Sequence, residues 1–244
     1  MKNQIRKLVA ALGYEVRGTR MTPRQLLQPQ LLRPLEFDDV VCRQMFEFGE
    51  ALSFVQVGAF DGVIQDPLRK YIVRCGWRGV MVEPQPRPVR SLRELYKDND
   101  RITVLQTALD RQQGTRPFFT VDSPDAPPWA GALASFQKDV ILKHADKIPG
   151  IENMIGQVSV DCITFDSVLD HLPDRELDLL QIDAEGADGF ILSCFPFGRV
   201  RPAIVHWEVR HLNLQERENC LSRLAGFGYR FAPSGDQDML ALRL

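Results

Sequence analysis

The sequence predicts an α/β domain with a mainly parallel sheet, helices on both faces of that sheet, and an antiparallel hairpin at the C-terminal end. Short β-rich runs alternate with helix-length amphipathic segments, which is the pattern of right-handed βαβ units. The length of 244 residues fits one main core. The expected parallel strands are Phe54–Val57, Val80–Glu83, Ile102–Gln106, Leu177–Ile182 and Ala203–Val209.

The hairpin is predicted from the spacing of the last two apolar runs. Tyr229–Ala232 and Met239–Leu242 are joined only by a short segment that contains PSGDQD. A crossover helix does not fit in that segment, whereas a hairpin turn does. The last two strands are therefore expected to be antiparallel on an otherwise parallel sheet.

The N-terminal part, residues 1–50, is expected to be a helical segment that packs on the main domain of residues 51–244. Ile5, Leu8, Val9 and Leu12 recur at helical spacing. A basic amphipathic helix can also rest on a membrane surface, and that alternative stays open. A connector is expected at residues 22–34, and a second helix at residues 37–48 leads into the first strand.

An insertion is expected at about residues 111–157. It contains PFFTVDSPDAPPWAGALASF and a helix at Lys138–Lys147, which is more than a strand-to-helix connection needs. Long insertions in α/β domains often act as substrate lids. The alternative is a surface excursion without a role in binding.

Composition argues against several classes of protein. Thirty Lys and Arg against 32 Asp and Glu give a net charge of -2, without the basic excess typical of nucleic-acid binding, so no nucleic-acid partner is expected. No segment approaches the roughly 20 apolar residues of a membrane span. The five cysteines are scattered without a CxxC pair, as expected for reduced thiols in a cytoplasmic protein. The pattern does not address the oligomeric state.

The stretch SFVQVGAFDG ends a buried strand in two glycines, Gly58 and Gly62. Glycine lets a ligand approach the backbone closely, and the carboxyl ends of parallel strands are the usual ligand site of such sheets. A tight turn needs glycine for the same reasons, and the dinucleotide fingerprint GxGxxG is absent. The turn is thus a candidate cofactor site.

Glu83 supports this interpretation. It ends the second strand in GVMVEPQP, about 20 residues beyond the glycine turn, where a carboxylate accepts hydrogen bonds from ribose hydroxyls. A solvated strand end or a helix cap is the alternative.

A polar cluster is expected at the same edge of the sheet. LDLLQIDAEGADG brings Asp183 and Glu185 to the end of the fourth strand, and one or more acidic residues there, Asp188 included, are expected to cap the next helix. In AIVHWEVRHL, His206 and Glu208 share a face of the fifth strand, and His211 follows its end.

The blocks FVQVGAFDG, VEPQP, QTALD, LLQIDAEGAD and WEVRHL occur in an order that resembles the FkbM family of S-adenosylmethionine-dependent methyltransferases, over roughly residues 53–229. The resemblance implies the class I methyltransferase (Rossmann-like) fold, with seven strands. It also implies O-methylation of a hydroxyl on a sugar, glycan or natural product, with S-adenosylhomocysteine as the product.

The resemblance implies roles for particular residues. Gly58, Ala59, Asp61 and Gly62 would surround the methionine end of the cofactor, Glu83 would hold its ribose, and Thr107 and Ala108 would lie near adenine. The full implied cofactor set is Gln56, Gly58, Ala59, Asp61, Gly62, Glu83, Pro84, Thr107, Ala108 and Asp183. Gln56 departs from the broader pattern, in which this position is commonly acidic, so affinity is expected to lean on Glu83 and Asp183.

For catalysis, His211 is the first choice as the base that takes the acceptor proton, because histidine changes charge near neutral pH. Glu208 or Glu185 would orient it or serve instead, and Asp183 would lie below the sulfonium. No metal is expected; if one bound, Asp183 and Glu185 would be its ligands.

Contact with the acceptor is expected from the insertion, through Trp129, Ser135, Phe136 and His144. Trp129 and Phe136 can equally pack the lid itself. Two other functions remain open. One is a non-catalytic scaffold that binds the cofactor. The other is a nucleotide-sugar or NAD-dependent enzyme on a similar sheet, which the missing GxGxxG disfavours.

Overall fold

The computed structural model describes residues 34–243. The expected N-terminal helix with Ile5, Leu8, Val9 and Leu12, and residues 22–33 of the expected connector, lie outside the described residues. The expected second helix is confirmed as α3 (Phe37–Phe48). Among the described residues, no helix has the length and apolar character needed to cross a membrane.

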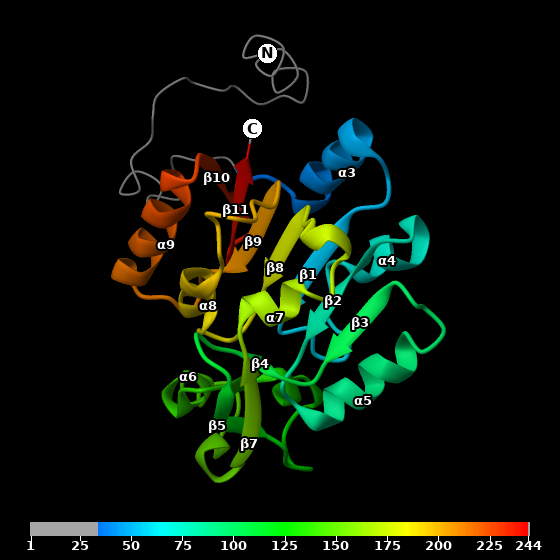
Figure 1. Cartoon of the computed structure of the whole chain (residues 1–244). Coiled ribbons are helices and arrows are strands. Elements are labelled where there is room, and N and C mark those ends of the chain that lie inside the picture. The colour runs from blue at the N-terminus through cyan, green and yellow to red at the C-terminus, as the bar shows by residue number, and fades with distance from the viewer. Residues whose placement is uncertain (1–33, 244) are drawn as a thin grey trace.

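The main sheet has seven strands in the order β10-β11-β9-β8-β1-β2-β3 (Figure 1). All seven predicted strands are confirmed, with ends that differ by at most two residues. Only β11 runs antiparallel to its neighbours, β9 and β10, so the predicted C-terminal hairpin is confirmed. The strands are β1 (Ser53–Val57), β2 (Arg78–Val82), β3 (Ile102–Leu105), β8 (Leu179–Ile182), β9 (Ile204–Glu208), β10 (Tyr229–Ser234) and β11 (Asp238–Arg243).

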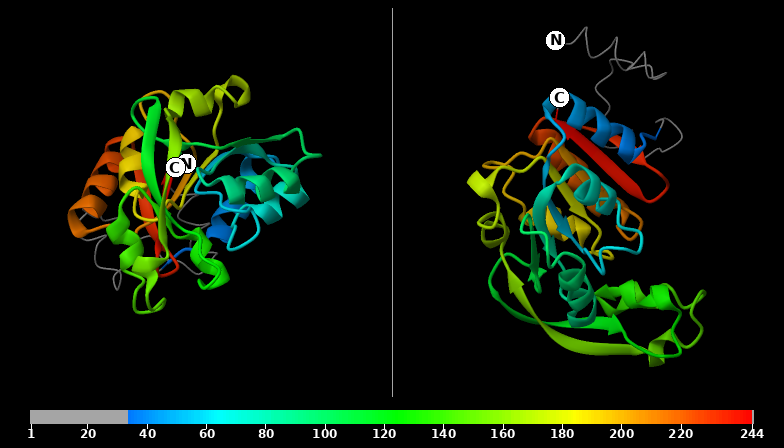
Figure 2. Two further views of the ribbon diagram at one scale, coloured as in Figure 1. Left: turned by 90° about the horizontal axis from the view of Figure 1, so that it is seen from below. Right: turned by 90° about the vertical axis from the view of Figure 1, so that its right-hand side faces the viewer.

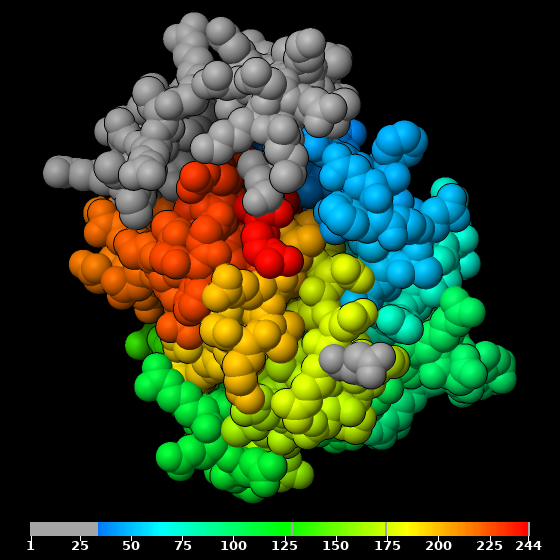
Figure 3. Space-filling view, turned by 45° about the horizontal axis from the view of Figure 1, so that its top comes forward, coloured from blue at the N-terminus to red at the C-terminus, as the bar shows by residue number. Residues whose placement is uncertain are grey.

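Helices cover both faces of this sheet because successive side chains of its buried strands point to opposite sides. Phe54 and Leu179 pack with residues of α3, α4 (Arg69–Cys75) and α5 (Pro86–Leu95). Val55 and Leu180 pack with residues of α7, α8 and α9 on the other face. Figure 3 shows α3 in blue and α9 in orange on either side of the C-terminal strand in red. The bounds are α7 (Phe165–Leu169), α8 (Asp188–Cys194) and α9 (Leu214–Gly226).

The insertion forms a second sheet of four strands in the order β4-β7-β5-β6. The long strands β5 and β7 pair antiparallel over eight residue pairs. The expected helix at Lys138–Lys147 is shorter, because α6 ends at Leu142 and the chain continues in turns. The elements are β4 (Ala108–Leu109), β5 (Gly114–Val121), β6 (Ala134–Ser135), β7 (Ile155–Ile163) and α6 (Lys138–Leu142), with short 3₁₀ turns at Pro128–Ala132, Ile151–Asn153 and Pro173–Arg175.

The second sheet lies beyond the carboxyl ends of β1 and β2 (Figures 1 and 2). It has its own core around Val121, Ile141 and Ile151. Two hydrogen bonds hold the region around the cavity together: Thr107 Oγ1 donates to the carbonyl of Asp161 at 2.8 Å, and Ser135 Oγ donates to the carbonyl of Glu185 at 3.1 Å. The insertion is thus fixed over the edge of the main sheet where parallel strands present ligand sites.

Candidate functional site

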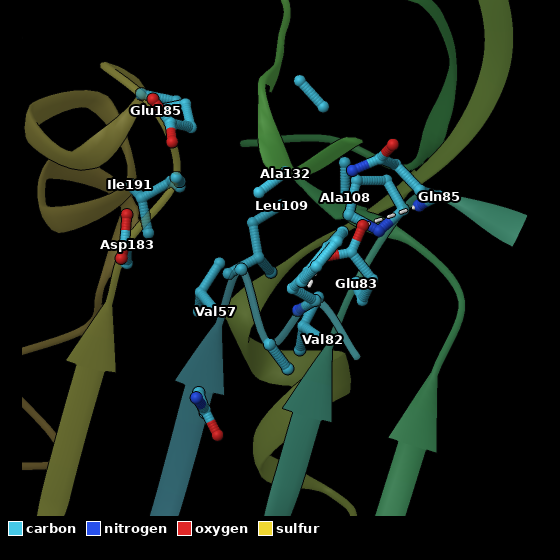
Figure 4. Close-up of a pocket in the computed structure, with 18 of the residues that line it drawn as sticks. Val57, Val82, Glu83, Gln85, Ala108, Leu109, Ala132, Asp183, Glu185 and Ile191 are labelled. Atoms are coloured by element: carbon cyan, nitrogen blue, oxygen red, sulfur yellow. Dashed lines mark hydrogen bonds between the residues drawn. The ribbon is translucent and has the colours of Figure 1, made fainter. Parts of the chain in front are cut away.

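A cavity of about 980 Å³, counted with its open mouth, lies at the carboxyl ends of β1, β2 and β8 (Figure 4). Both sheets line it, because Ala132, Ala134 and Phe136 of the insertion close the side opposite the main sheet. Its position at the carboxyl ends of parallel strands is the usual ligand site of such sheets. The cofactor residues expected from the sequence that line it are Gln56, Gly58, Ala59, Glu83, Pro84, Thr107, Ala108 and Asp183.

The turn after β1 requires glycine at Gly58. Its φ is +80°, and a Cβ at this position would lie 1.7 Å from the backbone oxygen of Asp183. The amides of Gly58 and Ala59 both donate to the carbonyl of Val82, at 3.0 and 3.2 Å. The turn is therefore bound to the end of β2 on one side and pressed against the end of β8 on the other.

Asp61 and Gly62 are not among the residues that line the cavity. Asp61 Oδ1 accepts hydrogen bonds from the amides of Val63 and Ile64, each at 2.9 Å, and so closes the turn. Gly62 lies against α5, where a Cβ would come within 2.5 Å of Leu92 Cδ1. Both residues shape the loop that carries Gly58.

Glu83 connects the loops that follow β1 and β2. Its Oε2 accepts from the amide of Phe60 at 3.0 Å and its Oε1 from the amide of Gln85 at 2.8 Å (Figure 4). Each oxygen of a carboxylate accepts two hydrogen bonds, so acceptor capacity remains on both. Burial raises the pKa of Glu83 to about 7.

Gln56 is paired with Asp66, a residue that the sequence analysis did not identify. Gln56 Nε2 donates to Asp66 Oδ1 at 3.3 Å. Gln56 Oε1 and Asp66 Oδ2 are both buried without a hydrogen-bond partner, and both residues line the cavity. A carboxyl group thus stands next to Gln56, where the sequence indicated an amide without charge. An aspartate placed just before a proline and a helix is an ordinary capping signal, so nothing local marked it as part of a cavity.

Four carboxyl groups, those of Asp183, Glu185, Asp188 and Glu208, gather at the ends of β8 and β9. Asp188 is fully buried and accepts from the amides of Ala184 and Gly186, which precede α8. It therefore holds the turn before the helix, and the expected capping of α8 by an acidic side chain is wrong, because no side chain caps the N-terminus of α8. The Asp183 side chain is exposed to the cavity. The protein around the cavity removes its carboxyl group from bulk water, and this effect, followed by repulsion from the nearby carboxyl groups, raises the pKa of Asp183 well above the usual range. Burial raises the pKa of Glu208 to about 9, with the carboxyl group of Asp183 adding to the shift.

His211 lies within this group of carboxyls, as the sequence predicted. Its Nε2 is 3.3 Å from Glu185 Oε2 and 3.9 Å from Glu208 Oε1. Gly186, with φ of +86°, permits this approach, because a Cβ there would lie 3.2 Å from Val140 Cγ2 and 3.3 Å from His211 Cβ. His211 therefore packs against one side of the turn between β8 and α8, and α6 of the insertion packs against the other side.

His206 lies elsewhere, although it shares β9 with Glu208. Its Nδ1 is hydrogen-bonded to Gln181 Oε1 at 2.7 Å, and its ring lies 4.7 Å from that of Phe37. Burial lowers the pKa of His206 to about 4, so the imidazole is neutral at physiological pH. It belongs to the packing of the sheet on α3.

The four residues expected to contact an acceptor take different positions. Phe136 lines the cavity and meets Phe118 edge to face at 4.9 Å, while the hydroxyl of Ser135 is bonded to the Glu185 carbonyl. His144 is buried, and its ring lies 5.5 Å from that of His211. Trp129 is 41% exposed with its ring 6.3 Å from that of His144, and it is not among the lining residues. The proximity of His144 to His211 was not expected, because it depends on how the insertion folds back.

Comparison with known proteins identifies the type of domain. A family model described as the methyltransferase FkbM domain matches residues 56–231. The solved structure of methyltransferase FkbM from Methylobacillus flagellatus KT matches with a TM-score of 0.51 and 14% identity over 90% of this chain and 50% of that chain, so this chain spans about half of that protein. Aeropyrum pernix fibrillarin, solved with natively bound S-adenosyl-L-methionine, matches with a TM-score of 0.41 and 12% identity over 79% of this chain and 66% of that chain. A search of curated proteins finds no match.

Replacing Gly58 should destabilise the fold more than its backbone conformation alone explains. Gly58→Ala forces β1 and β8 apart at the Asp183 carbonyl, and we expect a loss of about 2–4 kcal/mol in the free energy of unfolding. Gly228→Ala is the matched control, because Gly228 has φ of +91° and nothing within 4 Å of an added Cβ. Urea unfolding measures both, and equal losses in the two variants would contradict the close contact.

The buried carboxyl groups predict that stability falls as pH rises. Because the pKa of Glu208 is raised from 4.5 to about 9 in the folded state, its contribution is complete below pH 4.5 and is lost as pH rises toward 9. Glu208→Gln should reduce the loss in the free energy of unfolding between pH 5 and pH 9 by about 1–3 kcal/mol. The free energy of unfolding is measured from pH 5 to 9, without cofactor and with a chelator. The exposed Glu152→Gln serves as control, and an unchanged slope in Glu208→Gln would refute the assignment.

Proposed function

Because the chain belongs to the FkbM methyltransferase family, we propose that it transfers the methyl group of S-adenosylmethionine to a hydroxyl of a sugar, glycan or natural product. The observation that carries this proposal is the juxtaposition of two sets of groups at one edge of the sheet. The Gly58 turn and Glu83 lie on one side of the cavity, and Glu185 with its neighbour His211 lies on the other.

The residues of the cavity fit this cofactor. Glu83 retains acceptor capacity for the ribose hydroxyls, as the sequence analysis expected. Gln56 Oε1 and Asp66 Oδ2 are buried acceptors without donors, and the ammonium of a methionine end supplies donors and a positive charge. Thr107 and Ala108 would lie at the adenine end. Asp66 thus provides the carboxyl that Gln56 lacks.

The other groups of the site act on the acceptor. Bound S-adenosylmethionine supplies a methyl group on a positively charged sulfur. His211 activates the acceptor hydroxyl, because an alcohol attacks poorly while it keeps its proton, and Glu185 at 3.3 Å positions the imidazole. Phe136 and the adjoining part of the second sheet exclude water from the cavity and hold the acceptor in line.

A transfer assay tests the proposed function. The protein is incubated with methyl-labelled S-adenosylmethionine and a panel of sugars, glycans and hydroxylated natural products, and S-adenosylhomocysteine and labelled product are measured. We expect both to form in equal amounts with a hydroxylated acceptor. Label transferred to nitrogen, sulfur or carbon would contradict O-methylation.

Removing the Glu83 carboxylate should weaken cofactor binding. We expect Glu83→Ala to bind S-adenosylhomocysteine about 10- to 100-fold more weakly, because the acceptor of two hydroxyl hydrogen bonds is lost. Calorimetric titration measures the affinity. The exposed Glu94→Ala on α5 controls for loss of one negative charge. Unchanged affinity in a folded Glu83→Ala protein would remove Glu83 from the cofactor site.

Removing the His211 imidazole should affect turnover rather than cofactor binding. We expect His211→Ala to lower kcat by about 10²- to 10⁴-fold with little change in the affinity for S-adenosylhomocysteine. His171→Ala is the control, since His171 is exposed. A His211→Ala protein that keeps most of its activity would leave positioning of the substrates as the main source of catalysis.

A further inference from the structure

Three side chains from separate parts of the chain converge beside the cavity: His144, Glu185 and His211. One ligand atom from each lies within 4.8 Å of the other two. His144 comes from the insertion, just after α6; Glu185 comes from the turn after β8; and His211 follows β9. Only Glu185 also lines the cavity.

The close approach of His211 to Glu185 explains only part of this arrangement. The 3.3 Å distance between His211 Nε2 and Glu185 Oε2 is that of an ion pair when the imidazole is protonated. His144 is 5% exposed, and its Nε2 is buried without a partner. A buried ring nitrogen without a partner is unfavourable, so the packing of the insertion places a polar group there at a cost in stability. An ion that is coordinated by this imidazole nitrogen would offset that cost in stability.

The backbone around the three residues is built for close approach. Glu185 has φ of +46°, an uncommon conformation for a residue other than glycine, and Gly186 follows with +86°. The Ser135 hydroxyl donates to the Glu185 carbonyl, and Val140 packs on Gly186. The insertion is thus docked on this turn at several points, which holds His144 next to Glu185 and His211.

We propose that His144, Glu185 and His211 bind a divalent first-row transition-metal ion, such as zinc. Two imidazoles and one carboxylate are a ligand set of catalytic zinc and related ions, whereas magnesium and calcium take oxygen ligands. Ligand atoms around a tetrahedral zinc ion lie about 3.4 Å apart. The Glu185 and His211 ligand atoms, at 3.3 Å, already have that spacing. The ligand atom of His144 needs to move toward the other two by at most about 1.4 Å.

The proposed ion explains how His211 acts on the acceptor, and in this respect it rests on the proposed function. Three protein ligands leave a coordination position open in catalytic sites. An acceptor hydroxyl bound there would have its pKa lowered by the ion and would lose its proton to solvent. Its oxygen would then form a bond to the methyl carbon as the carbon–sulfur bond breaks and S-adenosylhomocysteine leaves. This differs from the metal expectation drawn from the sequence, which paired Glu185 with Asp183; Asp183 is not a member of this group.

Metal binding by the full chain tests the proposal without any assay of activity. Protein treated with a chelator and dialysed is titrated with zinc by calorimetry and with cobalt(II) by visible absorption. We expect one ion per chain, with affinity reduced about 100-fold or more in His144→Ala, Glu185→Gln and His211→Ala. His171→Ala should bind like the natural protein, because His171 is exposed and does not belong to the group of three ligands. Circular dichroism and urea unfolding of each variant verify that it is folded.

The outcomes separate this proposal from the function on which it rests. Zinc affinity that is equal in the natural protein and in folded His144→Ala would overturn the metal site, even if methyl transfer proceeds in the presence of chelator. A zinc site that depends on all three residues supports the proposal, even if the protein does not bind S-adenosylhomocysteine and the proposed function fails. An equal loss of affinity in His171→Ala would likewise refute the assignment of ligands.

Discussion

The candidate site depends on one close contact, between the backbone of Gly58 and the carbonyl of Asp183. No side chain fits at position 58, since a Cβ would lie 1.7 Å from that oxygen. The Asp183 amide donates to the Val57 carbonyl at 2.9 Å, and the Gly58 amide donates to Val82 at 3.0 Å. The ends of β8, β1 and β2 are thus tied together. Because of this contact, the loop with the glycine turn and the loop with the carboxyl groups open on one cavity.

The acidic side chains at this edge of the sheet lie where burial makes a charged carboxylate energetically unfavourable. Asp188 is fully buried, its pKa is raised to about 7 by burial, and it is used to hold the turn through two backbone amides. Asp183, Glu185 and Glu208 have no such structural bonds among the described side-chain contacts and lie near the cavity or His211. The raised pKa values of Asp183 and Glu208, without such a structural role, are typical of functional sites, and a bound cation would lower them.

The main sheet and the presence of an insertion were predictable from the sequence, but the second sheet that the insertion forms was not, for a physical reason. Buried parallel strands such as β1 and β8 are continuous apolar runs, and their ends carry the glycine and carboxylates that mark a site. The first half of β5 and most of the first seven residues of β7 are exposed, and Pro117 interrupts β5 before its apolar part, so their pattern did not indicate strands. Most of the residues expected on the cofactor side line the cavity, but Asp61 and Gly62 do not, and Asp66 was not identified. The contact of His144 with His211 and Glu185 arises only when the insertion folds back, and no local spacing carries that information.

The central claim is that the cavity at the carboxyl ends of β1, β2 and β8 binds S-adenosylmethionine rather than a dinucleotide. Parallel calorimetric titrations of the full chain with S-adenosylhomocysteine and with NAD measure this directly. We predict binding of S-adenosylhomocysteine with one site per chain and at least about 100-fold weaker binding of NAD, because the glycine turn lacks the dinucleotide fingerprint. Saturable binding of NAD without binding of S-adenosylhomocysteine would contradict the account.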